Sequence, residues 1–367
     1  MSFYNEYSKI KDFSFDNFFQ KIQGNDIRRI LDKDKLEPWD FLALLSPKAQ
    51  VYLEQMAQRA HMLSLQNFGK TILLYTPIYI SNHCVNKCVY CSFNAANNIA
   101  RKKLTMQEIE AEAREISKTG LKHVLVLTGE SRTQTPVSYI KDAVKVLKGY
   151  FEVVSIEIYP LTEEEYKEVI NAGVHGLVVY QEVYDEAIYD KLHLSGPKRD
   201  YHFRLDAPER ACRAKMRSVN IGALLGLNHW RREAFFTGLH ADYLQNKYLD
   251  VEISISLPRI RPYIGGCTDV YPVGDREFVQ IMLALKIFLP HVGIAISTRE
   301  RQGFRDQLIP LGVTKMSAGV STEVGGHKGE STGEGQFEIS DVRSVAEIRQ
   351  AIQAKGFQPI FKDWMDI

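Results

Sequence analysis

The run Thr71-Ile-Leu-Leu-Tyr-Thr-Pro-Ile-Tyr-Ile80, followed by Cys84-Val-Asn-Lys-Cys88-Val-Tyr-Cys91, sets the plan of this 367-residue chain. The first part is apolar and rich in aromatic and β-branched residues, which predicts a buried strand. The second part places three thiols in one short loop at the end of that strand. Because closed iron–sulfur and structural zinc sites usually take four protein ligands, three cysteines predict a metal centre with one open position.

The spacing of the thiols does not name the metal. A zinc site completed by His83 or by a remote histidine is the alternative to an iron–sulfur cluster. The other two cysteines, Cys212 and Cys267, are far away in the sequence and have no nearby cysteine partner. We therefore expect a single metal site.

Short β-branched runs alternate with helical patterns from Thr71 onward. The predicted strands are Thr71–Ile80, His123–Thr128, Val153–Tyr159, Gly176–Tyr180, Val219–Leu225, Val251–Ser256, Gly293–Thr298 and Val313–Ser317. The predicted helices between them include Met106–Lys118, Ser138–Leu147, Glu163–Asn171 and Arg231–Tyr248. About eight strand–helix units with strands that are apolar on both faces predict an α/β fold, a (β/α)8 TIM barrel. An open doubly wound sheet is the alternative, because periodicity does not reveal closure.

The two ends of the chain differ from this alternating pattern. Residues 1–66 have helical periodicity throughout, and we expect an N-terminal helical extension that caps the barrel. We expect the barrel to span residues 67–320. Residues 321–367 should form the rest of a Gly-rich, mobile loop (319–338) and a last helix, Asp341 to Lys355, packed on the barrel.

Composition limits the functional class. A formal net charge of +1 gives no electrostatic basis for binding nucleic acid. No apolar run approaches the roughly 20 residues that span a bilayer, and residues 1–19 lack the apolar centre of a secretory signal. An odd number of cysteines, with three in one loop, argues against a disulfide framework. We expect a cytoplasmic protein that binds neither membrane nor nucleic acid.

The pattern CxxxCxxC, with an aromatic residue before the last cysteine, resembles the radical S-adenosylmethionine (SAM) enzymes. The resemblance implies that Cys84, Cys88 and Cys91 hold one [4Fe-4S] cluster whose open iron binds SAM, and that Tyr90 lies beside the adenine. Thr128-Gly129-Glu130 is similar to the family's GGE motif, which binds the SAM amino group, with threonine in place of the first glycine.

A second segment adds to the resemblance. Tyr201-His-Phe-Arg-Leu-Asp206 is similar to a segment of biotin synthase in which the arginine pairs with the SAM carboxylate, which implies that role for Arg204. Gln181 and Glu182 fall where that relative has polar residues on the SAM ribose. The alternative is a surface charge at Arg204 and a helix cap at Glu182.

Arg299, in Ser297-Thr-Arg-Glu300, follows a predicted strand at the same end of the barrel as the cysteine loop. An amino-acid substrate needs a cation for its carboxylate, and Arg299 is the candidate. Ser297 and Ser317 are candidates for hydrogen bonds to the same ligand. A structural ion pair of Arg299 with Glu300 or Asp306 is the alternative.

Taken together, several segments resemble the 2-iminoacetate synthase family over nearly the whole chain. They are Leu45-Ser-Pro47, Tyr52-Leu-Glu-Gln-Met-Ala-Gln-Arg-Ala60, Thr128-Gly-Glu130, Val179-Tyr-Gln-Glu182, Pro258-Arg-Ile-Arg-Pro262, Ser297-Thr-Arg-Glu300, Gln336-Phe-Glu-Ile-Ser-Asp341 and Lys362-Asp-Trp364. The resemblance implies a lyase of thiamine biosynthesis that cleaves the Cα–Cβ bond of L-tyrosine to 2-iminoacetate (dehydroglycine) and p-cresol. It also implies a flavodoxin or ferredoxin type reductant and a thiazole synthase partner.

Other functions remain open at this point. A tryptophan lyase or a deazaflavin-cofactor synthase could share the scaffold, and a zinc-binding barrel or an electron carrier would involve no radical step. The family member that matures iron-iron hydrogenase has an additional carboxyl-terminal domain with further cysteines. This sequence has no cysteine after Cys267, so we expect no second cluster.

Overall fold

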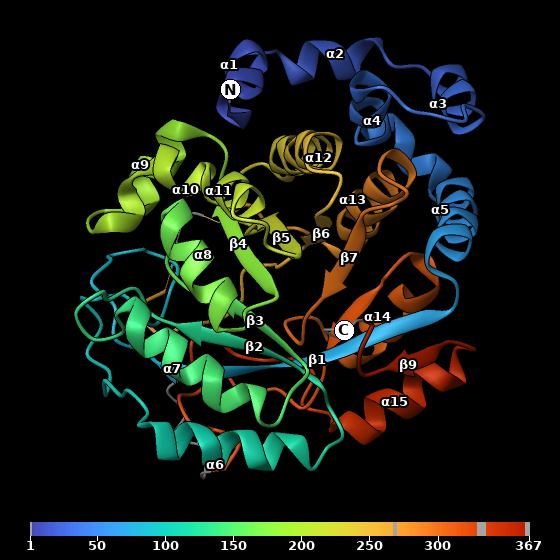
Figure 1. Ribbon diagram of the computed structural model, residues 1–367. Helices are drawn as coiled ribbons and strands as arrows, with labels where there is room; N and C mark the ends of the chain where they lie inside the picture. Colours follow the sequence, from blue (N-terminus) through green and yellow to red (C-terminus); the bar gives the residue numbers. More distant parts are fainter. Residues whose placement is uncertain (1, 267–269, 329–334, 364–367) are drawn as a thin grey trace.

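Eight parallel strands form a closed barrel in the computed structural model, which describes residues 2–266, 270–328 and 335–363 (Figure 1). The strands are β1 (Thr71–Ser81), β2 (His123–Thr128), β3 (Val153–Glu157), β4 (Gly176–Glu182), β5 (Ser218–Ala223), β6 (Glu252–Ser256), β7 (Gly293–Ile296) and β8 (Lys315–Ser317). Each strand pairs with the next, β8 pairs with β1, and β1 pairs with β2, so the sheet has no open ends in this ring. The predicted TIM barrel is confirmed, and the open doubly wound sheet is excluded.

Strand β1 is the longest strand and joins the two ends of the ring. Its middle, Leu73–Tyr75, pairs with β8, and its second half pairs with β2 from Thr76 to Ser81. Val124, Val126, Val154 and Ile156 are among the fully buried residues of the neighbouring strands. These apolar strands are covered on both faces, which is the arrangement that near-continuous apolar runs predict.

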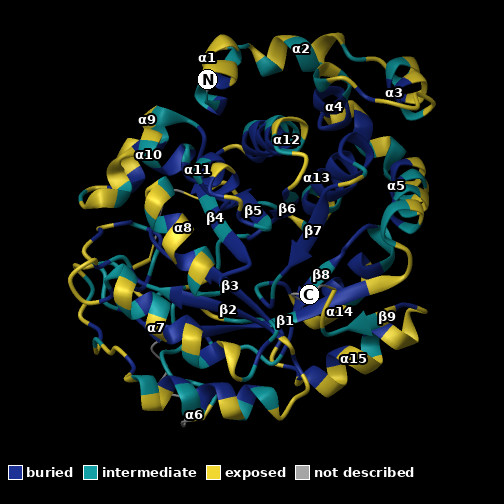
Figure 2. Ribbon diagram, in the orientation of Figure 1, coloured by how far each residue is buried: buried dark blue, intermediate teal, exposed yellow. Residues whose placement is uncertain are grey.

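Helices surround the barrel, and most of them have a buried side and an exposed side (Figures 1 and 2). They are α6 (Met106–Ser117), α7 (Val137–Lys148), α8 (Glu163–Ala172), α9 (Glu186–Leu192), η2 (Pro197–Arg199), α10 (Tyr201–Leu205), α11 (Ala207–Arg213), α12 (Trp230–Lys247), α13 (Asp275–Phe288), α14 (Gln302–Leu308) and η3 (Ile309–Leu311).

Helix α6 illustrates why these segments are helical. Thr105 and Glu108 form a capping box, and Ile109, Ala113 and Ile116 recur at helical spacing on the buried face. Within the described residues, no helix has both the length and the apolar character needed to cross a bilayer.

The first part of the chain is helical, as predicted. Its elements are α1 (Phe3–Ile10), α2 (Phe15–Lys21), α3 (Gly24–Leu31), α4 (Pro38–Leu44), η1 (Pro47–Tyr52) and α5 (Leu53–Phe68). Figure 1 shows them running along the outside of the barrel, next to α12 and α13. Ser46 caps η1 through a hydrogen bond from the Ala49 amide, with Pro47 in the first turn.

The carboxyl-terminal part differs from the prediction in two ways. The last helix, α15, spans Val345–Ala354 rather than starting at Asp341, because Ser344 forms the capping box with Glu347. A ninth strand, β9 (Gln358–Ile360), was not predicted. It pairs with Thr71–Leu73 of β1, ahead of the stretch that pairs with β2. Three residues are too few to show a period in the sequence.

The Gly-rich segment is held against the barrel where it is described. The Gly325 amide donates to the Tyr79 carbonyl, and the amides of His327 and Lys328 donate to the Glu112 carboxylate. These hydrogen bonds give residues 325–328 defined partners on β1 and α6, and the mobility of the loop stays a prediction. Gly329 and Gly333 of that loop, as well as Cys267 and Trp364, lie outside the described residues.

Candidate active site

The cysteine loop lies at the carboxyl end of β1 and is fixed from two sides. On one side, the Val85 amide donates to the Glu130 carbonyl at the end of β2. On the other side, the amides of Lys87 and Val89 donate to the carbonyls of Ser195 and Leu192. The loop therefore has a defined backbone path between β2 and the segment that follows α9.

Two asparagine side chains form the hydrogen bonds that hold this loop in the absence of regular secondary structure. Asn82 bonds both the Ala100 carbonyl and the Lys102 amide, at 2.7 Å each. Asn86 donates to the Glu130 carboxylate at 2.6 Å and accepts from the Lys198 amide at 2.9 Å. Short amide side chains supply the donors and acceptors that a loop lacks.

The three cysteines face one cavity of ≈ 640 Å³. Four of the SAM-binding candidates line the same cavity: Gly129, Glu130, Glu182 and Arg204. Among the described residues, no three His, Cys, Asp or Glu side chains are arranged to hold a single metal ion. In a four-iron cluster each cysteine binds a different iron. The cysteine Sγ atoms therefore lie further apart than the ligands of a single metal ion do.

Gly129 shows how closely the cysteine loop approaches the end of β2. A Cβ atom at Gly129 would lie 2.4 Å from the His83 carbonyl oxygen and 3.1 Å from Cys84 Cβ. The Gly129 amide donates to the Ser81 carbonyl. Only glycine fits this position, since real side chains do not approach a backbone atom so closely.

Glu182, Lys198 and Arg204 form a buried charged group next to the cysteines. Glu182 Oε1 lies 2.7 Å from Lys198 Nζ and 3.4 Å from Arg204 Nη2. Glu182 has a φ of 70°, and the β4 ladder shifts register between Tyr180 and Glu182. The alternative of an exposed Arg204 and a helix-capping Glu182 is therefore wrong. The bulge directs the Glu182 side chain inward.

Tyr90 lines a second cavity of ≈ 510 Å³ that adjoins the first one and includes Lys198 and Arg299. Its hydroxyl lies 2.6 Å from His193 Nε2, and His193 Nδ1 lies 2.7 Å from the Tyr189 carbonyl. Burial lowers the pKa of His193 to about 2, so the imidazole is neutral. The His193 Nδ1–H group then donates a hydrogen bond to the Tyr189 carbonyl, and Nε2 accepts a hydrogen bond from the Tyr90 hydroxyl, which fixes the Tyr90 ring.

Gln181 is placed differently from the other SAM-binding candidates. It is buried, neither amide atom has a hydrogen-bond partner, and it does not line either of these two cavities. The bulge brings Glu182, not Gln181, to the cavity wall.

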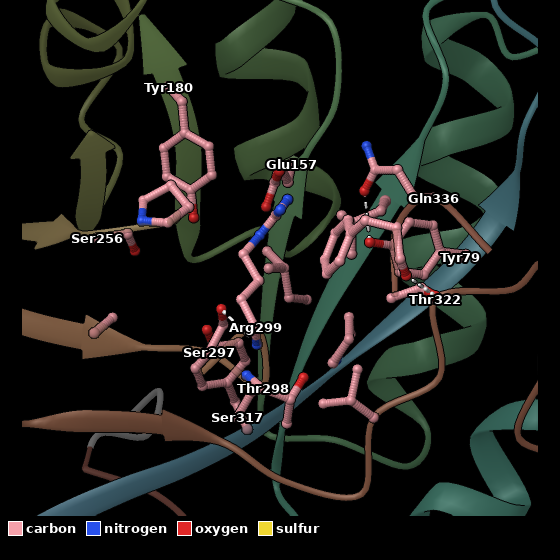
Figure 3. Close-up of a pocket in the computed structure, with 18 of the residues that line it drawn as sticks. Tyr79, Glu157, Tyr180, Ser256, Ser297, Thr298, Arg299, Ser317, Thr322 and Gln336 are labelled. Atoms are coloured by element: carbon pink, nitrogen blue, oxygen red, sulfur yellow. Dashed lines mark hydrogen bonds between the residues drawn. The ribbon is translucent and has the colours of Figure 1, made fainter. Parts of the chain in front are cut away.

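Arg299 lies in a third cavity, of ≈ 580 Å³, together with Ser297 and Ser317 (Figure 3). Its guanidinium carbon stacks 3.4 Å from the centroid of the Phe337 ring. The only hydrogen bond of the guanidinium within the described residues goes to the Arg259 carbonyl, at 3.4 Å. Most of its donors therefore remain available to a ligand in the cavity.

The proposed structural pairs of Arg299 are not formed. Glu300 is paired with Arg259, and Asp306 is paired with Arg343. Both alternatives were wrong, because other arginines bind these two carboxylates. Burial lowers the pKa of Arg299 from its ordinary value.

Several residues that line these cavities were not predicted from the sequence, among them Glu157, Lys198, Arg261 and Gln336. Glu157 ends β3, so the rule that polar residues follow the strands could have found it. Gln336 accepts from the Tyr79 hydroxyl at 2.7 Å, and its amide nitrogen lies 3.9 Å from Cys91 Sγ. No local sequence signal places Gln336 there, because it comes from the far end of the chain.

Comparisons with known proteins agree with this geometry. Residues 78–239 match the Radical SAM superfamily, and residues 256–358 match the Biotin and Thiamin Synthesis associated domain. The chain is 37% identical to 2-iminoacetate synthase of Escherichia coli strain K12 over 358 residues, 96% of this chain and 95% of that protein. The chain belongs to the 2-iminoacetate synthase family. The 2-iminoacetate synthase of Salmonella typhimurium strain LT2 matches equally, at 37% over the same share of both chains.

Solved structures related to this 2-iminoacetate synthase family member share its fold. HydG, described as a maturase of the [FeFe]-hydrogenase, superposes with a TM-score of 0.90 at 30% identity, over 96% of this chain and 80% of that chain. The family confirms the predicted radical SAM lyase and excludes the zinc-binding barrel and the electron carrier. Radical SAM proteins generally use a [4Fe-4S] cluster and SAM, and three convergent cysteines beside a glycine cradle fit such groups.

Proposed function

We propose that this protein cleaves the Cα–Cβ bond of L-tyrosine to 2-iminoacetate and p-cresol, using one [4Fe-4S] cluster and SAM. The observation that carries the proposal is the 37% identity to 2-iminoacetate synthase over 96% of the chain. The cavity around Arg299 adds a cation for the substrate carboxylate and apolar walls for an aromatic ring, among them Leu125, Leu127 and Tyr79.

The cluster would be held by Cys84, Cys88 and Cys91. Gly129, Glu130, Glu182, Arg204 and Tyr90 would hold SAM in the two adjoining cavities. When bound, these groups would supply a 5′-deoxyadenosyl radical for removing a hydrogen atom from the substrate.

The residues of this chain position and enclose the substrate. Arg299 binds the tyrosine carboxylate through its planar fork, and the hydroxyls of Ser297 and Ser317 lie in the same cavity. Phe337 covers one face of the guanidinium and keeps water away from it. This fixes the substrate near the reactive position, where reacting atoms must come within about 3–3.5 Å.

Two protein partners follow from this reaction. A flavodoxin or ferredoxin type donor would reduce the cluster, and the exposed Val85 and Lys87 of the cysteine loop give it a close approach. A thiazole synthase would receive 2-iminoacetate directly, because the imine hydrolyses in water. The grouping of cysteines in one metal-binding loop suits the reducing cytoplasm.

The test is an anaerobic assay of the reconstituted protein with SAM, dithionite and L-tyrosine, with L-tryptophan as the comparison substrate. We expect 5′-deoxyadenosine and p-cresol to appear together with tyrosine, and no cleavage product with tryptophan. Deoxyadenosine without p-cresol would retain the radical chemistry but refute tyrosine cleavage. Neither product from protein with an intact cluster would refute both.

A further inference from the structure

Glu157 occupies the junction of the three cavities. It is the last residue of β3 and pairs in register with Leu127 of β2. Of the described residues, Glu157 and Gln336 are the two that line the cysteine cavity, the Tyr90 cavity and the Arg299 cavity. A group at this point lies between the metal-binding and substrate-binding parts of the site.

The Glu157 carboxyl has no hydrogen bond or ion pair with any described residue, unlike the nearby carboxylate of Glu182. The charged and titratable groups around it come from β1, β4, η2, α10 and the segment after β7. They are Tyr75, Tyr79, Tyr180, Glu182, Lys198, Arg204 and Arg299. Burial raises the pKa of Glu157 to about 7, although the charge of Arg299 opposes this shift. Glu157 is half-buried and faces the cavities, where a carboxyl without a protein partner is costly unless a ligand supplies one.

Arg299 and Glu157 together match the charges of an α-amino acid. Figure 3 shows the Arg299 side chain extending from the end of β7 toward Glu157, across the cavity that both residues line. Neither residue pairs with the other in the described structure, so both keep hydrogen-bonding capacity for a ligand. In an α-amino acid the carboxylate and the ammonium are attached to one carbon, and therefore need a cation and an anion on facing walls.

We propose that Glu157 binds the amino group of the substrate and accepts one proton from it. The N–H bond of the ammonium breaks, an O–H bond forms on the carboxylate, and a neutral amine remains next to Arg299. This inference rests on the proposed function, in which hydrogen is then removed from that amine. The charged form of the amino group would repel the SAM sulfonium, so the proton transfer also removes an unfavourable contact between two cations.

The test measures binding to the holoprotein, loaded with cluster and SAM but without a reductant, so that no turnover occurs. The ligands are L-tyrosine and 3-(4-hydroxyphenyl)propionate, which lacks the amino group. Glu157→Gln should weaken tyrosine binding by about tenfold to a hundredfold, since a charge-assisted hydrogen bond is lost. It should leave binding of the propionate unchanged. Glu152→Gln is the control, because Glu152 lies next to the other end of β3 and pairs with Lys362 at the surface.

Proton release gives a readout that does not depend on activity. Calorimetry in buffers of different ionisation enthalpy should detect release of about one proton when tyrosine binds at pH 6, and almost none at pH 8. The sign follows from the proton balance. At pH 6 Glu157 is largely protonated before binding, so it first releases its own proton to the solvent and then accepts the proton of the substrate ammonium. At pH 8 Glu157 is already ionised, and the ammonium proton moves to it without release to the solvent. Glu157→Gln should abolish this release.

Three results would overturn the inference alone, with p-cresol formation intact. They are unchanged tyrosine affinity in Glu157→Gln, equal weakening of both ligands, and no proton release by the wild-type protein at pH 6. The last result decides the matter even if the variant does not fold. Absence of tyrosine binding to the wild-type protein would instead refute the proposed function, and the inference with it.

Discussion

Arg305 and Asp341 form an ion pair without solvent exposure. Arg305 Nη1 lies 2.5 Å from Asp341 Oδ2, and both side chains are 0% exposed. The second terminal nitrogen of Arg305 donates to the Ser317 carbonyl at 2.6 Å. The pair therefore connects α14, the end of β8 and the segment before α15, and it holds Ser317, which lines the Arg299 cavity.

Asp341→Asn should reduce the free energy of unfolding by about 3–5 kcal/mol, because it leaves the Arg305 charge buried without its counterion. Urea denaturation followed by circular dichroism measures this loss. Combining Asp341→Leu with Arg305→Met should recover part of it, since the buried charge at position 305 is then removed as well and Arg343, the other partner of Asp341, keeps its pair with Asp306. A loss below about 1 kcal/mol in the single variant would show that the pair contributes little.

Cys88→Ala should abolish binding of the cluster, because only two cysteines would then remain to hold its four irons. The matched variant is Cys212→Ala, at a buried cysteine on α11, away from the cavity. We expect it to retain its iron and to lose only packing energy. Iron and sulfide analysis with visible absorption distinguishes them, and equal iron content in both variants would contradict the ligand assignment.

Gly129→Ala should displace the cysteine loop, since the added methyl group would overlap the His83 carbonyl. We expect a loss of about 1–3 kcal/mol in stability and weaker binding of SAM and of the cluster. Gly303→Ala in α14 is the control, because its Cβ meets nothing within 4 Å and alanine favours a helix. Thermal unfolding and SAM titration measure the two effects. Normal SAM affinity in Gly129→Ala would refute the cradle.

Arg299→Lys should raise the dissociation constant for tyrosine about tenfold or more while SAM binding is unchanged, because lysine cannot form the bidentate contact. Arg301→Lys serves as the comparison, since Arg301 is exposed and pairs with Asp275. Equilibrium binding of each ligand to the holoprotein tests this directly. If tyrosine affinity is the same in both variants, Arg299 has no part in substrate binding.

The sequence by itself determined the eight barrel strands, the helical character of the segments between them and the position of the cysteine loop, because each of these depends on local patterns. Apolar runs such as Thr71–Ile80 specify buried strands, and a strand end specifies where polar residues gather. The cysteine loop and the motif at Gly129 could also be recognised from the sequence, because each lies within one short stretch of it. What sequence periodicity could not supply was closure, which depends on the pairing of β1 with β2 and β8.

Only the tertiary structure decided which distant groups meet in one site. Glu157, Arg299 and Gln336 come from three different parts of the chain and line one cavity because the barrel brings them together. The partners of Glu300 and Asp306 were also decided at this level, since Arg259 and Arg343 reach them from other segments. Contacts between residues far apart in sequence depend on packing geometry, for which a single sequence has no local signal.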